Sequence, residues 1–146
     1  MKDFVRIGKH SVGFDPETGF IHICHVGTMN GPEMVELADR IAYYVNTFHP
    51  GEARFELVDN RKSTGFTREA REALRNHPMG REDNFLALWG ASIGVRTVIN
   101  LMFKALSLVN ASKTVATAKA TEAEAREWLT EQRNAYRSRR AKVAES

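Results

Sequence analysis

One stretch of the chain, residues 85–109, constrains the fold more than any other. A short apolar run over residues 85–89 leads through a tight turn at Gly90 into a long helical pattern that ends near Val109. A strand that enters a helix through a glycine turn is half of a β-α-β unit, and such units build parallel sheets. The stretch therefore predicts an α/β fold with a parallel sheet.

The predicted helix carries more apolar surface than contact with one sheet can bury. Its apolar residues fill about two-thirds of the circumference, whereas a surface helix needs about a third. We expect its central apolar face to lie on the sheet, through Val95, Val98, Met102, Leu106 and Val109. The flanking residues Leu101, Phe103 and Leu108 form a candidate partner surface. Trp128 of the last helix is expected to cover one flank, and a second copy of the chain or an apolar ligand the other.

The rest of the chain alternates strand and helix patterns. Strands are predicted over residues 4–14, 20–26, 54–58 and 113–118, and helices over residues 30–48 and 67–75 and from residue 121 onward. Asn30, Thr67 and Thr121 stand before these helices as capping residues. The order β-β-α-β-α-β-α-β-α predicts a single mostly parallel sheet with an antiparallel N-terminal edge hairpin and helices packed on it. We expect residues 1–131 to form one α/β domain and residues 132–146 a basic helical extension or tail.

Composition and charge narrow the class of protein. The 146 residues are 42% hydrophobic and 27% charged, which is ordinary for a globular domain, and the net charge of +3 is too small to indicate nucleic acid. The single cysteine, Cys24, and the lack of a signal-peptide pattern favour a cytoplasmic location. Arg96 and Lys104 interrupt the apolar helix, so we expect no transmembrane segment.

The turn before the long helix contains a catalytic-looking pattern. Residues 90–94 match G-x-S-x-G, the nucleophile elbow of α/β-hydrolases, with Ser92 in the position of the nucleophile. In those enzymes the histidine base follows the serine, yet all five histidines of this chain precede Ser92. We therefore interpret Ser92 as a helix cap, and we expect no catalytic residue and no cofactor.

The same turn is a candidate site for an anion. Backbone N–H groups at the start of a helix point outward and favour negative charge, so Gly90, Ala91 and Ser92 could hold a phosphate or a phospholipid headgroup. Arg61, Lys62 and Arg96 are basic residues that the fold could bring near. Neither a P-loop lysine nor a G-x-G-x-x-G pattern is present, so no nucleotide fingerprint supports this interpretation.

The phrase His22-Ile23-Cys24-His25 contains residue types that bind metals. Side chains alternate along a strand, so His22 and Cys24 share one face and His25 points to the other. Two ligands do not complete a zinc site. We predict a buried cysteine with partly buried histidines and no metal.

Basic residues gather in two places. Arg68, Arg71 and Arg75 fall on one face of the short helix, which is either a solvated face or a docking surface for an acidic partner. The C-terminal segment carries a second group: Arg133, Arg137, Arg139, Arg140 and Lys142. This basic tail could contact anionic lipid or nucleic acid, but Tyr136 is its only aromatic residue, so we do not expect nucleic acid. A solvated helix end is the alternative.

Several phrases of the chain resemble the SpoIIAA-like (STAS-like) family. They are FELVD at residues 55–59, STGFT at 63–67, ALWGAS at 87–92 and TEAEAREWL at 121–129. This family is related in fold to anti-sigma-factor antagonists and, more distantly, to lipid-carrying CRAL-TRIO domains. Phosphorylatable antagonists carry Asp-Ser-(Ser/Thr)-Gly where their second helix begins. Here Thr67-Arg-Glu-Ala70 stands there, so the resemblance does not extend to that phosphorylation site.

Together these features predict a non-enzymatic STAS-like interaction or regulatory module. We expect it to bind a second copy of itself or another cytoplasmic protein. The resemblance to CRAL-TRIO domains implies an alternative, an apolar-ligand (lipid) binding protein or peripheral-membrane carrier. A third hypothesis is a hydrolase with Ser92 as its nucleophile.

Overall fold

The computed structural model describes residues 2–78, 83–109 and 114–145, and the side chains of all of these except residues 2 and 102–109. The elements follow one another as β1 (Lys2–Ile7), β2 (His10–Asp15), β3 (Phe20–Met29), α1 (Gly31–Phe48), β4 (Arg54–Phe66), α2 (Arg68–Asn76), β5 (Asn84–Trp89), α3 (Ile93–Val109), β6 (Thr114–Lys119) and α4 (Glu122–Glu145).

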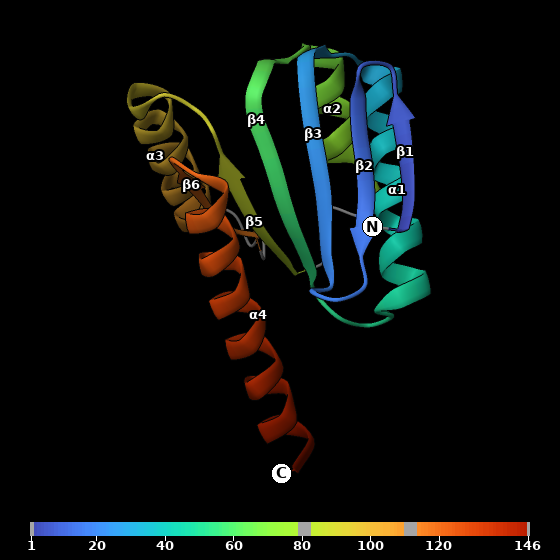
Figure 1. Ribbon diagram of the computed structural model, residues 1–146, viewed down its shortest axis with the longest axis vertical. Helices are drawn as coiled ribbons and strands as arrows, with labels where there is room; N and C mark the ends of the chain where they lie inside the picture. Colours follow the sequence, from blue (N-terminus) through green and yellow to red (C-terminus); the bar gives the residue numbers. More distant parts are fainter. Residues whose placement is uncertain (1, 79–82, 110–113, 146) are drawn as a thin grey trace.

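The strands form a single sheet in the order β1-β2-β3-β4-β5-β6 (Figure 1). The pairs β1–β2 and β2–β3 are antiparallel, and β3 to β6 are parallel to one another. This confirms the predicted mostly parallel sheet with an antiparallel N-terminal edge. The prediction of one strand over residues 4–14 is wrong, because Gly8 at φ +61° turns the chain and pairs Ile7 with His10.

The helices cover the two faces of the sheet unequally. α1 contacts β1, β2 and β3, and α2 lies beside it and reaches β4. α4 packs against β4, β5 and β6 from the opposite face, so that Figure 1 shows α4 in front of the sheet and α1 and α2 behind it. Among the described residues no helix is long and apolar enough to cross a lipid bilayer.

Two apolar clusters hold these layers together. The larger lies between the sheet and α1 and contains the fully buried Tyr44, Met29 and Val12. The smaller lies under α4, where Phe55 and Phe85 of the sheet meet Leu129. One sheet therefore separates two cores, as expected when apolar residues occupy both faces of parallel strands.

The predicted helix caps are confirmed. The Asn30 side chain accepts a hydrogen bond from the Glu33 N–H at 2.9 Å, and the Glu33 carboxylate accepts one from the Asn30 N–H at 3.0 Å, which makes a capping box. The Thr67 hydroxyl accepts from the Ala70 N–H at 3.1 Å, and the Thr121 hydroxyl accepts from the Glu124 N–H at 3.2 Å.

β3 and β4 both run further than predicted. They remain paired as far as Met29 and Phe66, through two register shifts that follow Cys24 and Gly27. Gly65 takes φ +115° in this region. The sequence pattern missed this extension because bulges break the alternation of apolar and polar residues on which strand prediction rests.

α3 lies against the sheet edge on a different side from the one predicted. Of the residues expected to face the sheet, Val95 and Val98 are 50% and 56% exposed, and the side chains of Met102, Leu106 and Val109 lie outside the described residues. Instead, the Asn100 side-chain amide donates to the Ala118 carbonyl oxygen at 3.3 Å and accepts from the Ala118 N–H at 2.8 Å. β6 is the last strand of the sheet, so alternate backbone groups lack a strand partner. Asn100 satisfies two of them, and these two hydrogen bonds attach α3 to the edge strand β6.

Trp128 packs on the cluster under α4 that contains Phe55 and Phe85. The flank of α3 that it was expected to cover includes Phe103 and Leu108, whose side chains lie outside the described residues.

Candidate functional site

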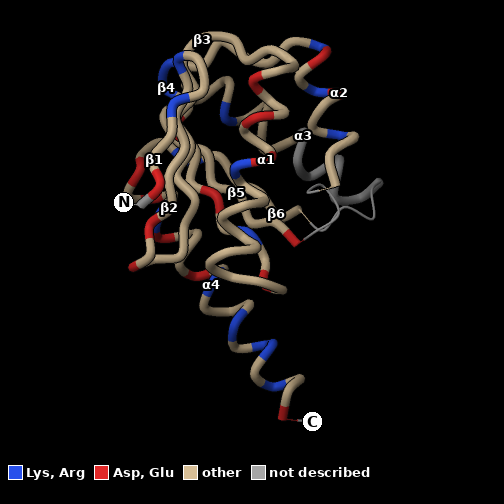
Figure 2. The backbone as a smooth tube through the Cα atoms, turned by 90° about the vertical axis from the view of Figure 1, so that its right-hand side faces the viewer, with Lys and Arg blue, Asp and Glu red and all other residues tan. Residues whose placement is uncertain are grey.

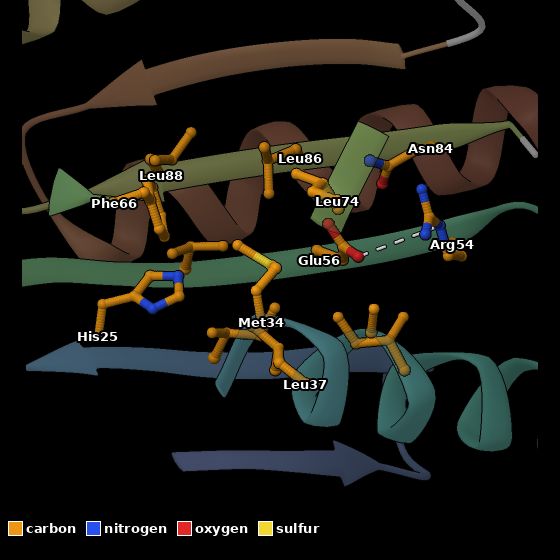
Figure 3. A pocket seen from close by; sticks show the side chains of 14 residues that line it. His25, Met34, Leu37, Arg54, Glu56, Phe66, Leu74, Asn84, Leu86 and Leu88 are labelled. Atoms are coloured by element: carbon orange, nitrogen blue, oxygen red, sulfur yellow. Dashed lines mark ion pairs between the residues drawn. The ribbon is translucent and has the colours of Figure 1, made fainter. Parts of the chain in front are cut away.

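A cavity of about 250 Å³ lies between the sheet and helices α1 and α2 (Figure 3). Its wall is mostly apolar and takes residues from β3, β4, β5, α1 and α2. The lining residues are Ile23, His25, Met34, Leu37, Ala38, Ile41, Arg54, Glu56, Val58, Phe66, Leu74, Asn84, Leu86 and Leu88. We refer to this space as the sheet–helix cavity.

Strand periodicity explains which side chains reach it. Successive residues of a strand point to opposite faces, so β4 sends Arg54, Glu56 and Val58 to the cavity, while Phe55 and Leu57 join the cluster under α4. β5 is in register with β4, which places Asn84 beside Arg54, Leu86 beside Glu56 and Leu88 beside Val58. These six side chains form the floor, and α1 and α2 form the other wall.

Polar groups gather at one end of the floor. Figure 3 shows Arg54 and Asn84 close together there, with Glu56 next to them. The three residues are only 4%, 7% and 5% exposed. Nε of Arg54 lies 4.0 Å from Oε1 of Glu56. Within the described part of the chain, Nε and Nη1 of Arg54 and Oδ1 of Asn84 have no hydrogen-bond partner.

Burial governs the charge of the Glu56 carboxyl. Loss of water raises its pKa, and the neighbouring Arg54 charge and Asn84 amide offset this only in part. The neutral form is therefore favoured more than in an exposed glutamate, because a buried carboxylate is costly without strong hydrogen bonds.

His25 lies at the opposite end of the cavity (Figure 3). Burial lowers its pKa to about 4, and the nearby His10 adds to this effect. Its ring meets the rings of His10 and Phe66 edge-on, at centroid distances of 5.5 and 5.1 Å. At neutral pH His25 is thus an uncharged imidazole, so the two ends of the cavity differ in charge.

The metal-like phrase is split by the sheet, as predicted. His22 and Cys24 line a separate hollow on the other face, beside Asp59 and Trp89. The Cys24 thiol lies 3.7 Å from Oδ2 of Asp59, and burial together with that carboxylate raises the pKa of the thiol. Among the described residues no group of three or more His, Cys, Asp or Glu side chains is placed to hold a metal ion.

The turn at Gly90, Ala91 and Ser92 is a helix entry. The Ser92 hydroxyl accepts from the Val95 N–H at 3.4 Å, as expected of a cap. Arg61 is the cation brought against this turn, with its guanidinium 4.5 Å above the Trp89 ring. That guanidinium is already paired with Asp59 at 2.9 Å. Anion binding at this turn stays a prediction.

The predicted docking arginines on α2 lie at the surface. Arg68, Arg71 and Arg75 are all exposed. Arg68 pairs with Glu72 at 3.0 Å, and Arg71 donates to the Phe66 carbonyl oxygen at 2.8 Å. An acidic partner for this face also stays a prediction.

The candidate partner surface on α3 is described only in part. Leu101 is 62% exposed, as predicted, and it is joined by Ile93, Val95 and Val98. The side chains of Phe103 and Leu108 lie outside the described residues. The described part of α3 thus presents an exposed apolar face.

The basic residues of α4 divide into two groups. Arg133 donates to the Thr18 carbonyl oxygen at 2.6 Å, and Arg137 pairs with Glu52 at 2.7 Å, so both fasten α4 to the domain. The other three are exposed on the distal turns, where Figure 2 shows recurring basic residues: Arg139, Arg140 and Lys142. Tyr136, which lies between Arg133 and Arg137 in the sequence, packs on Phe55 and Phe85.

Comparison with known proteins agrees with this architecture. The structure is similar to that of an uncharacterised protein of the DUF3478 family with a SpoIIAA-like fold from Shewanella loihica PV-4. The TM-score is 0.65 at 12% sequence identity, over 82% of this chain and 93% of the other. No protein-family model matches the sequence, and no curated protein does. The chain therefore has a SpoIIAA-like fold, as the resemblance implied.

The polar end of the cavity was not among the residues singled out from the sequence. A signal was present, because Arg54 and Glu56 occupy alternate positions of a strand that is predicted to lie inside a sheet between helices. Charged residues on such a strand are rare unless they are paired or functional. Asn84 gave no signal of its own, and only the register of β5 with β4 places it beside Arg54.

Proposed function

We propose that the chain is a non-enzymatic STAS-like binding module that holds a small, mainly apolar molecule in the sheet–helix cavity. The single observation that carries this proposal is an apolar cavity with buried polar atoms at its two ends that are unpaired among the described residues: Nε and Nη1 of Arg54 and Oδ1 of Asn84 at one, and Nδ1 of His25 at the other. Such a combination of apolar wall and few polar groups is typical of ligand sites. A plain structural core would be expected to close up and to bond its polar groups.

The volume limits the size of the ligand. An engineered apolar cavity of about 150 Å³ holds benzene, so a cavity of about 250 Å³ suits a molecule of roughly ten non-hydrogen atoms. Each CH₂ group buried contributes about 0.8 kcal/mol. An eight-carbon chain therefore supplies enough apolar contact for measurable binding.

Two lining residues also reach solvent. Leu74 of α2 is 40% exposed and Phe66 at the end of β4 is 36% exposed, although both line the cavity. They mark the side from which a ligand could enter. A bulky residue at position 74 should obstruct this route without disturbing the buried floor.

The test is a titration with 1-octanol followed by methyl NMR. We expect saturable shifts of the Met34, Leu86 and Leu88 methyl signals in the wild type and much weaker binding in Leu74→Trp. Val35→Trp is the matched control, because Val35 is an exposed residue of α1 that does not line the cavity. Unshifted cavity methyls at saturating octanol, or equal binding by both variants, would contradict the proposal.

A second candidate function is self-association through α3, which the sequence also predicted. It is favoured by the exposed apolar residues of this helix, Ile93, Val95, Val98 and Leu101. Two copies meeting through this face would bury the same residues on each side, as an isologous dimer does.

A further inference from the structure

The charge of Arg54 lacks full compensation inside the fold. Its side chain is buried, and the closest carboxylate oxygen, Oε1 of Glu56, lies 4.0 Å from Nε. That is an ion-pair distance and too long for a hydrogen bond. Within the part of the chain that the structure describes, neither Nε nor Nη1 is hydrogen-bonded. Buried guanidinium groups usually donate bidentate bonds to carboxylates, so Arg54 has unused donors.

The side chains around Arg54 leave that capacity open. Asn84 lies beside it on β5, and its amide nitrogen, which already donates to Glu56, carries a second N–H. Burial raises the pKa of Glu56, so its carboxyl is a weaker counter-charge for the guanidinium than an exposed carboxylate would be. Among the described residues, the polar end of the cavity therefore holds two unpaired donors of Arg54 beside one unpaired acceptor, Oδ1 of Asn84, and this excess of donors fits an anionic group.

We infer that the ligand is an apolar monocarboxylate of medium chain length, with its carboxylate bound by Arg54 and Asn84. Its hydrocarbon chain lies along Leu86, Leu88 and Met34, which line the remaining length of the cavity. This inference rests on the proposed function, because it assigns a ligand class to the same cavity.

The residues at the opposite end of the cavity determine which way the bound ligand points. His25 is uncharged at neutral pH, and Phe66 beside it is apolar. No second cation among the described lining residues competes for the carboxylate. The acid group is therefore directed to Arg54 and the methyl end of the chain to His25.

Three ligands with the same chain and different head groups test this: octanoate, 1-octanol and octylammonium. Calorimetric titration of the wild type should show octanoate binding at least about tenfold more tightly than octanol, because hydrogen bonds to charged groups are the stronger ones. Arg54→Met should remove this preference while octanol still binds. Arg75→Met removes a charge from the exposed surface of α2 and should keep the preference.

A second variant, Asn84→Leu, tests the same inference if Arg54→Met does not fold. Asn84→Leu removes one amide donor, leaves Arg54 in place and should reduce the octanoate preference severalfold. Equal binding of octanoate and octanol, tighter binding of octylammonium, or an unchanged preference in Arg54→Met would overturn the carboxylate inference alone. Failure of all three ligands to bind would instead contradict the proposed function.

Discussion

Replacing both residues of the buried pair Arg54 and Glu56 should change the free energy of unfolding little, whereas replacing only one of them should lower it. The two charged atoms lie 4.0 Å apart, with both residues at most 5% exposed. At that distance the attraction is about 4 kcal/mol for an effective dielectric constant near 20. Removing each ion from water costs several kcal/mol. The two contributions therefore nearly cancel, and the pair makes little net contribution to the free energy of unfolding.

Three variants separate these contributions. Glu56→Leu leaves Arg54 as an uncompensated buried charge and should lower the free energy of unfolding by about 3–5 kcal/mol. The double variant Arg54→Met/Glu56→Leu should equal the wild type or exceed it by about 1–4 kcal/mol. The control Arg68→Met/Glu72→Leu replaces an exposed pair on α2 and should change stability by only about 0.5 kcal/mol.

Urea denaturation followed by circular dichroism measures all three. The double variant should fold and lose the octanoate preference, which would show that the pair is kept for binding rather than for stability. A double variant that is less stable than the wild type by more than about 2 kcal/mol would refute this reasoning, because the pair would then be a net stabilising interaction.

Three other features of the structure lead to measurable expectations. The pKa of His25 is about 4 in the fold and 6.5 without it, so the free energy of unfolding should fall as the pH is lowered from 6.5 to 4. This group contributes roughly 3 kcal/mol to that fall, and urea denaturation of His25→Gln should show a correspondingly flatter pH profile. Gly90→Ala should destabilise by about 1–3 kcal/mol, because Gly90 has φ +89° and an added Cβ would meet Cγ of Arg61 at 2.3 Å. Gly94→Ala, in the open first turn of α3, should be neutral or stabilising by up to about 1 kcal/mol in the same assay. If α3 joins two copies, Val98→Asp should sediment as a folded monomer where the wild type sediments as a dimer; a wild type that is monomeric at high micromolar concentration contradicts self-association.

The fold was largely predictable because its signals are local. The glycine turn after residue 89 and the capping residues Asn30 and Thr67 each mark an element from a few neighbouring residues. The side on which α3 rests was not predictable, because it depends on Asn100 finding the open edge of β6. That contact joins residues 18 positions apart and overrides the hydrophobic pattern of the helix.

The candidate site was less predictable than the fold. Motifs and clusters of basic residues in the sequence indicated Ser92, Arg68 and the basic tail at residues 132–146. The polar end of the cavity is not a motif. It arises from strand register, which places Asn84 beside Arg54, and from helices that bury both residues. Register and burial are properties of the assembled sheet, and a single sequence specifies them only indirectly.

We propose that a small apolar acid occupies the sheet–helix cavity. Intermolecular NOEs between octanoate and the protein test it most directly, because they report which residues the bound chain touches. We expect NOEs from the octanoate chain to the methyl groups of Met34, Leu86 and Leu88. The octanoate protons next to the carboxylate should give their strongest NOEs to the Arg54 side chain. NOEs to the exposed face of α3 instead, or to no cavity residue, would contradict it.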